Sequence, residues 1–188
     1  MKSYVPPRPW PARQAATGRA REATGSEEAA RQAALLTGLR RAHCSLEALG
    51  QALPGWQRLA HAPGLAAQLA MLEAVAAEAL HRIDFILSRL DEPSEAGGAT
   101  VPGWIAAAEL AYPKDAEDGS DATLAALAHW ALGRLAARGL ALVTLAHEAG
   151  EYQAAHLLRL SVEEGRAAAR GLVPHLTPRR TLSAPRLH

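Results

Sequence analysis

Apolar residues recur at three- and four-residue intervals along four stretches of this chain, a pattern typical of amphipathic helices. The first stretch begins at Ser26, which can cap a helix, and Pro54 predicts a stop or a kink at its other end. The second begins at Pro63, a residue favoured in the first turn of a helix, and it stops near Pro93. Each stretch therefore predicts a helix that buries one face.

Two further stretches lie in the second half of the chain. Asp121 can cap the first of these, which ends at Gly150, and the next runs from Tyr152 to Gly171. Roughly 30 residues rich in Gly, Pro and acidic side chains separate them from the earlier pair. Within this connection, the apolar segment 101–111 predicts one short helix.

The lengths of the connections predict the architecture. Helices joined by short links are antiparallel neighbours, whereas a connection of about 30 residues can run the length of a bundle and return. Two antiparallel hairpins joined by one long crossover are typical of the ferritin-like arrangement. We therefore predict an all-α, ferritin-like four-helix bundle whose crossover contains a short helix.

The two ends of the chain differ from the middle. Residues 1–25 hold closely spaced prolines and several arginines, which favours a flexible arm over an organelle-targeting peptide. Residues 174–188 form a basic, proline-containing tail that we also expect to be flexible. The bundle should then cover residues 26–173.

The composition narrows the fold class and the partners. Of the 188 residues, 49% are hydrophobic but only 4% are aromatic, and β-branched residues are scarce, which excludes a β-sandwich or barrel. A formal net charge of +1 argues against nucleic-acid binding through a broad cationic face. No run reaches the roughly 18 apolar residues of a membrane-spanning helix, and no secretory signal is evident. We expect a cytoplasmic protein that binds neither nucleic acid nor membrane.

Two segments resemble the YciE/YciF-like family of bacterial ferritin-like proteins. The sequence ALPGWQRLAHAPGL leads into the second helix as the family's Ala-Leu-Pro step and short link do, and LAHEAGEYQAAHLLRLSVEEGRAA resembles its last hairpin, with a double glutamate. The resemblance covers residues 35–173. It implies a homodimer of four-helix bundles, often linked to stress responses, with a two-metal carboxylate site in some members.

The resemblance also places the family's metal ligands on this chain. The carboxylate of the first helix falls on Leu46, and Glu47, one residue away, is rotated from it by about 100° around the helix. The ligand stretch of the second helix falls on residues 72–77, where only Glu73 is acidic.

In the second hairpin, the match is kept only on the last helix. The ligand triplet of the third helix falls on residues 132–134, which end in Arg134, whereas the fourth helix keeps Glu163 and Glu164. A pair of iron or manganese ions needs several inward carboxylates, and an uncompensated buried charge is costly. We therefore interpret the metal centre as lost and expect no cofactor.

A metal-binding alternative stays open. Glu78 and His81 are spaced three residues apart on one face of the second helix, as in the Glu-x-x-His motif of dinuclear carboxylate proteins. Under this alternative the chain is a di-iron or di-manganese oxidase, peroxidase or storage protein, with the ligands Glu47, Glu73, Glu78, His81, Glu163 and Glu164.

A glutamate kept inside the bundle needs a cationic partner. We expect a buried ion pair between Arg134 and Glu163, in which a guanidinium stands where the metal would be; Arg138 and Glu164 could replace either member. The alternative is that both glutamates are solvated on the outer face of the last helix.

These observations favour a non-catalytic, homodimeric structural or interaction module, although they leave the question of enzyme activity open. Alanines of the third long helix would let another helix approach closely: Ala125, Ala126, Ala136 and Ala137. An adaptor that binds protein partners through its flexible termini is a further alternative.

Overall fold

Four long helices form the protein, in a computed structural model that describes the backbone of residues 14–90 and 120–177 and the side chains of residues 26–90 and 121–177. They are α1 (Gln14–Leu59), α2 (Pro63–Arg89), α4 (Ser120–Glu148) and α5 (Tyr152–Leu172), and a 3-10 turn, η1 (Val173–His175), follows α5. The described residues contain no strand. The predicted all-α four-helix bundle is thus confirmed.

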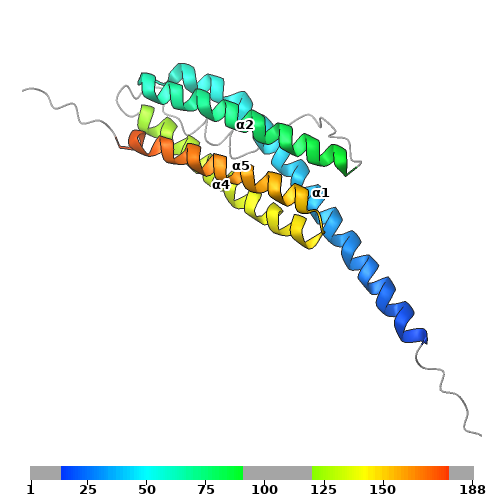
Figure 1. The fold of residues 1–188 in the computed structure, drawn as a ribbon. Coiled ribbons are helices and arrows are strands. Elements are labelled where there is room, and N and C mark those ends of the chain that lie inside the picture. The colour runs from blue at the N-terminus through cyan, green and yellow to red at the C-terminus, as the bar shows by residue number, and fades with distance from the viewer. Residues whose placement is uncertain (1–13, 91–119, 178–188) are drawn as a thin grey trace, which may run out of the picture.

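The helices pack as two hairpins laid against each other (Figure 1). α1 lies beside α2 and α4 beside α5, and the hairpins meet through α2 with α5 and through α1 with α4. α2 and α4 are diagonal neighbours. The connection between them, residues 91–119, lies outside the described residues, and so does the short helix predicted at 101–111.

Two groups of buried side chains fill the bundle. One surrounds Trp56, whose side chain is 4% exposed, near the link between α1 and α2, and the other lies near the turn between α4 and α5. Leucine and alanine dominate both groups. They occupy the positions that the three- and four-residue spacing predicts to be buried. A fully buried leucine contributes about 1.5–3 kcal/mol to folding relative to an exposed one.

Helix α1 is longer than the sequence pattern predicts at both ends. It begins at Gln14 and projects from the bundle (Figure 1), so Ser26 lies inside the helix and part of the expected flexible arm is helical. At its other end it continues through Pro54 to Leu59. Leu53 and Trp56 on either side of this proline are buried, and their packing outweighs the cost of about 3 kcal/mol for a proline inside a helix.

Gly150 makes the tight turn between α4 and α5. Its φ of 78° lies in the left-handed region that glycine adopts without strain. The N–H of Gly150 donates to the carbonyl of His147 over 3.1 Å, and the N–H of Glu151 donates to that of Ala146 over 2.8 Å. This pair of bonds is the Schellman motif, which satisfies the last carbonyls of α4 and reverses the chain.

Asp121 lies in the first turn of α4, and its side chain reaches the link between α1 and α2. Its carboxylate oxygens accept hydrogen bonds from the backbone N–H groups of His61 and Ala62, over 2.8 and 2.7 Å. These groups lie just before α2, whose first turn has no acidic residue of its own. Asp121 therefore joins the start of α4 to the α1–α2 link and places a negative charge at the positive end of α2.

No helix in the described ranges holds an apolar stretch of the length and hydropathy that crossing a bilayer requires.

Candidate functional site

A small cavity lies at the centre of the bundle, between the two groups of buried side chains. Its volume is about 60 Å³, and all four helices contribute to its wall. The lining is hydrocarbon apart from Arg138 and Ser161. The apolar lining residues and glycines are Ala42, Leu46, Leu49, Val75, Ala76, Ala79, Ile83, Leu132, Leu135, Ala136, Gly139, Leu142, Leu158, Val162 and Gly165.

Glycines set how closely the helices approach around this cavity. A Cβ atom added at Gly139 of α4 would collide with Cγ2 of Val162 on α5. A Cβ added at Gly38 of α1 would likewise collide with Cδ2 of Leu142 on α4. Both glycines therefore allow a branched side chain of the neighbouring helix to pack against the bare backbone.

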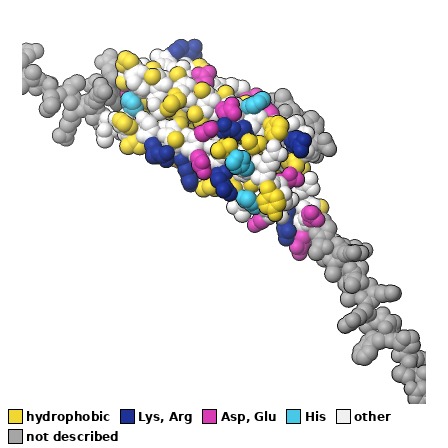
Figure 2. Space-filling model, viewed as in Figure 1, with side chains coloured by type: hydrophobic (Ala, Val, Ile, Leu, Met, Phe, Trp, Pro, Cys, Tyr) yellow, Lys and Arg dark blue, Asp and Glu magenta, His cyan; other side chains and the backbone are white. Residues whose placement is uncertain are grey.

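Arg82 and Glu164 form a bidentate ion pair between α2 and α5, beside the cavity. Nη1 of Arg82 lies 2.6 Å from Oε2 of Glu164, and Nη2 lies 3.0 Å from Oε1. Nη1 also donates to the hydroxyl of Ser161 over 3.2 Å, and Nη2 lies 3.2 Å from Oε1 of Glu78. One guanidinium thus holds two carboxylates, and Figure 2 shows acidic and basic side chains side by side over α2 and α5.

The pair is partly shielded from water. The Arg82 side chain is 14% exposed, and that of Glu164 is 41% exposed. Hydrogen bonds to the Glu164 carboxylate raise the pKa of the Arg82 guanidinium above its ordinary value, against the opposing effect of burial. Parallel N–H···O bonds between a guanidinium and a carboxylate fix geometry as well as charge, so this pair is formed only when α2 and α5 have the register seen in the structure.

The predicted ion pair of Arg134 with Glu163 is not formed in the structure. The guanidinium of Arg134 lies over the ring of Trp130, 5.1 Å from its centroid, and Glu163 is exposed. Arg138 donates to the hydroxyl of the buried Ser45 on α1, over 3.1 Å. Adjacent residues differ by about 100° around a helix, so Glu164 meets Arg82 of α2 while Glu163 is exposed.

The other predicted metal ligands are dispersed. Glu73 accepts a hydrogen bond from Nε2 of Gln57 over 2.8 Å, Glu78 pairs with Arg82, and His81 is exposed. Glu47 is half-buried on α1. Of the predicted ligands, only Glu78 and Glu164 meet, and they meet around a guanidinium.

The residues present do not fit a two-metal centre. Such a centre needs several carboxylates at one level of the bundle, whereas Ser45 is the one buried polar residue among those described. No group of three His, Cys, Asp or Glu side chains in the described part of the chain is arranged to hold an ion. The central cavity is lined by hydrocarbon apart from Arg138 and Ser161 and has no carboxylate in its wall.

Sequence reasoning missed Arg82 and the contact between His43 and Asp84. Arg82 lies four residues after Glu78, a spacing that predicts an ion pair on one helix, but nothing in the sequence indicates the second partner on α5. Nε2 of His43 on α1 lies 3.0 Å from Oδ1 of Asp84 on α2. The contacts of Arg82 with Glu164 and of His43 with Asp84 each join two helices, so they depend on how those helices are shifted and rotated relative to each other.

Comparison with known proteins supports the fold. No protein-family model and no curated protein sequence matches this chain. Among solved structures, it is similar to YcfI from Rhodopseudomonas palustris, described as "a putative structural protein". The TM-score is 0.70, the alignment covers 76% of this chain and 92% of that one, and the sequence identity is 24%. At this identity the likeness establishes a shared helical fold and carries no activity with it.

Proposed function

We propose that this protein is a non-catalytic structural or interaction module in which a ferritin-like bundle has lost its dinuclear metal site. The observation that carries the proposal is the aliphatic cavity at the centre of the bundle together with the use of Glu78 and Glu164 as partners of Arg82. A guanidinium between two carboxylates supplies the positive charge that a metal ion would otherwise supply, without redox chemistry.

Two further observations support this function. The similar protein YcfI is described as "a putative structural protein". On the basis of the resemblance to YciE/YciF-like proteins, the proposed module is a homodimer that lies in the cytoplasm and acts in bacterial stress responses.

Metal analysis tests the proposal. The full chain is expressed in medium supplemented with iron or manganese, purified without chelators, and its metal content is measured by mass spectrometry. We expect well below one ion per chain and no absorbance change on adding peroxide. An authentic di-iron bundle protein, prepared in parallel, controls for metal loss during purification.

A variant separates specific from adventitious binding. Glu78→Gln with Glu164→Gln removes the two carboxylates that meet in the structure, and we expect it to leave the low metal content unchanged. Two ions per wild-type chain that disappear in this variant would show that the chain is a dinuclear metalloprotein.

A further inference from the structure

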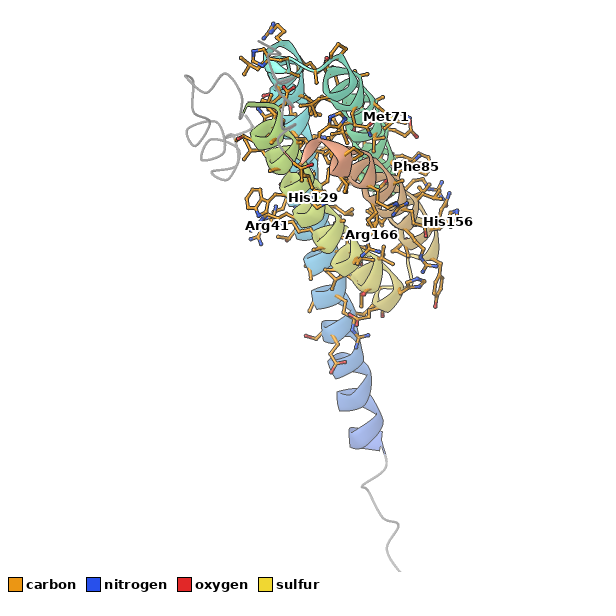
Figure 3. All side chains as sticks on the ribbon, turned by 90° about the vertical axis from the view of Figure 1, so that its left-hand side faces the viewer. Arg41, Met71, Phe85, His129, His156 and Arg166 are labelled. Carbon is orange, nitrogen blue, oxygen red and sulfur yellow. The ribbon has the colours of Figure 1, made fainter. Side chains whose placement is uncertain are left out.

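A groove runs along the surface between α4 and α5, on the outside of the second hairpin. Its volume is about 420 Å³. In Figure 3, His129 of α4 and Arg166 of α5 lie along this side, whereas Met71 and Phe85 lie along α2 elsewhere on the bundle. The lining residues are His129, Leu132, Gly133, Ala136, Ala137, Leu140, Arg166, Ala169 and Arg170.

The wall of the groove on α5 is cationic. Arg166 and Arg170 are four residues apart, which places them on one side of the helix with about 6 Å between their Cβ atoms. Among the side chains that the structure describes, neither arginine takes part in an ion pair. Along α4, no acidic residue occurs between Asp121 and Glu148. Neither arginine of the groove is thus neutralised by an ion pair, and the nearest carboxylate on this side of α5 is that of the exposed Glu163, three residues before Arg166.

The floor of the groove is formed by small residues. Gly133 is exposed, and a Cβ atom added there would meet nothing within 4 Å. Ala137 is exposed beside it, whereas Ala136 and Ala125, on the same predicted alanine face, are buried against the bundle. Small side chains let the axis of an additional helix come close, while Leu140, 40% exposed, offers an apolar contact at one end.

We propose that this groove binds an acidic amphipathic helix of a partner protein. The apolar face of that helix would lie on the alanine and glycine floor, and carboxylates one turn apart would pair with Arg166 and Arg170. Two arginines one turn apart on α5 can each pair with a carboxylate when a second helix carries carboxylates at the same spacing, whereas a ligand with one anionic group could pair with only one of them. This inference rests on the proposed interaction role, and it names the chemistry of the partner.

A designed peptide tests the groove on the full chain. The probe is a fluorescent, alanine- and leucine-rich helical peptide with glutamate at every fourth position, and its counterpart carries glutamine instead. We expect the glutamate peptide to bind at least tenfold more tightly than the glutamine peptide, as measured by fluorescence anisotropy. No binding of the glutamate peptide at 1 mM, or equal binding of both peptides, overturns the proposal.

Matched variants locate the binding. Arg166→Glu with Arg170→Glu should weaken binding of the glutamate peptide at least tenfold, whereas Arg58→Glu with Arg89→Glu, an equal change of charge on α1 and α2, should change it less than twofold. Gly133→Leu, at a position where an added Cβ atom meets nothing within 4 Å, should fill part of the groove and weaken binding at unchanged charge. Equal losses in the two double variants overturn the proposal.

The outcome is independent of the metal analysis. A chain that takes up two metal ions would contradict the proposed function while leaving the peptide result intact. A glutamate peptide that binds the wild type and the groove variants equally tightly would contradict this inference alone.

Discussion

Glu164 of α5 is held by Arg82 of α2 through two parallel N–H···O contacts of 2.6 and 3.0 Å. The same guanidinium reaches Glu78 on its own helix and the hydroxyl of Ser161 on α5. A single arginine thus joins the two hairpins at the level of the central cavity. It satisfies two carboxylates that the sequence had suggested as metal ligands.

This relationship predicts an energetic coupling between the two hairpins. Hydrogen bonds to charged groups contribute about 1.5–3 kcal/mol, and the exposure of Glu164 to solvent reduces the expected coupling to about 1 kcal/mol. Arg82→Met and Glu164→Gln should each lower the free energy of unfolding, and the double variant should cost less than the sum of the two. Urea denaturation of the four proteins measures this coupling.

The exposed Arg58 provides the control for this cycle, because it lies on the surface of α1. Arg58→Met should change the free energy of unfolding by less than about 0.5 kcal/mol. Additive effects of Arg82→Met and Glu164→Gln would show that the pair does not stabilise the bundle.

The pair should also persist at alkaline pH. Hydrogen bonds to Glu164 raise the pKa of Arg82 in the folded state, so its contribution is complete below the unfolded-state pKa and is lost only as the pH rises through the still higher folded-state pKa. The stability difference between wild type and Arg82→Met should therefore be equal at pH 8 and pH 10.

A lysine at the same position should behave differently. The unperturbed pKa of lysine is about 10.4, so the Arg82→Lys variant should approach Arg82→Met in stability as the pH rises from 8 to 11. Urea denaturation at these pH values checks this, and differences between variants cancel the titration of other groups. A constant gap between the lysine and methionine variants would contradict an electrostatic role for this position.

Asp121 should contribute more to the free energy of unfolding than its partly exposed position suggests. Replacing it with alanine removes the acceptor of two backbone N–H groups, those of His61 and Ala62, and the negative charge near the start of α2. We expect Asp121→Ala to lower the free energy of unfolding by about 1–2 kcal/mol. Glu163→Ala removes an exposed carboxylate of α5 and should cost less than about 0.5 kcal/mol, and thermal unfolding compares the two.

The helices and their hairpin order could be predicted because they depend on local patterns. The spacing of leucines and alanines defines the buried faces, and Gly150 marks the turn between α4 and α5. The ends of α1 could not be predicted in the same way. Its passage through Pro54 depends on Leu53 and Trp56, whose burial requires the neighbouring helices.

The sequence led us to expect that an arginine pairs with a glutamate of the last helix, but it did not indicate that the two residues are Arg82 and Glu164. The expectation that too few carboxylates face inward, and that an arginine replaces a cation, came from placing the metal ligands of YciE/YciF-like proteins on this sequence. Which arginine meets which glutamate depends on the rotation and register of α2 against α5. Adjacent residues differ by about 100° around a helix, so Glu163 and Glu164 face different directions. Arg134, on α4, lies over the ring of Trp130 and meets neither glutamate.

Two glycines of α4 predict opposite effects of the same substitution. Alanine is favoured over glycine inside a helix by about 1 kcal/mol, so Gly133→Ala, in open space, should raise the free energy of unfolding. At Gly139 the added methyl group would collide with Val162, so Gly139→Ala should lower it by about 1 kcal/mol or more. Thermal and urea unfolding measure both changes. Adding Val162→Ala to Gly139→Ala should recover part of the loss, because it removes the colliding methyl group; a further loss of equal size would place the cost elsewhere.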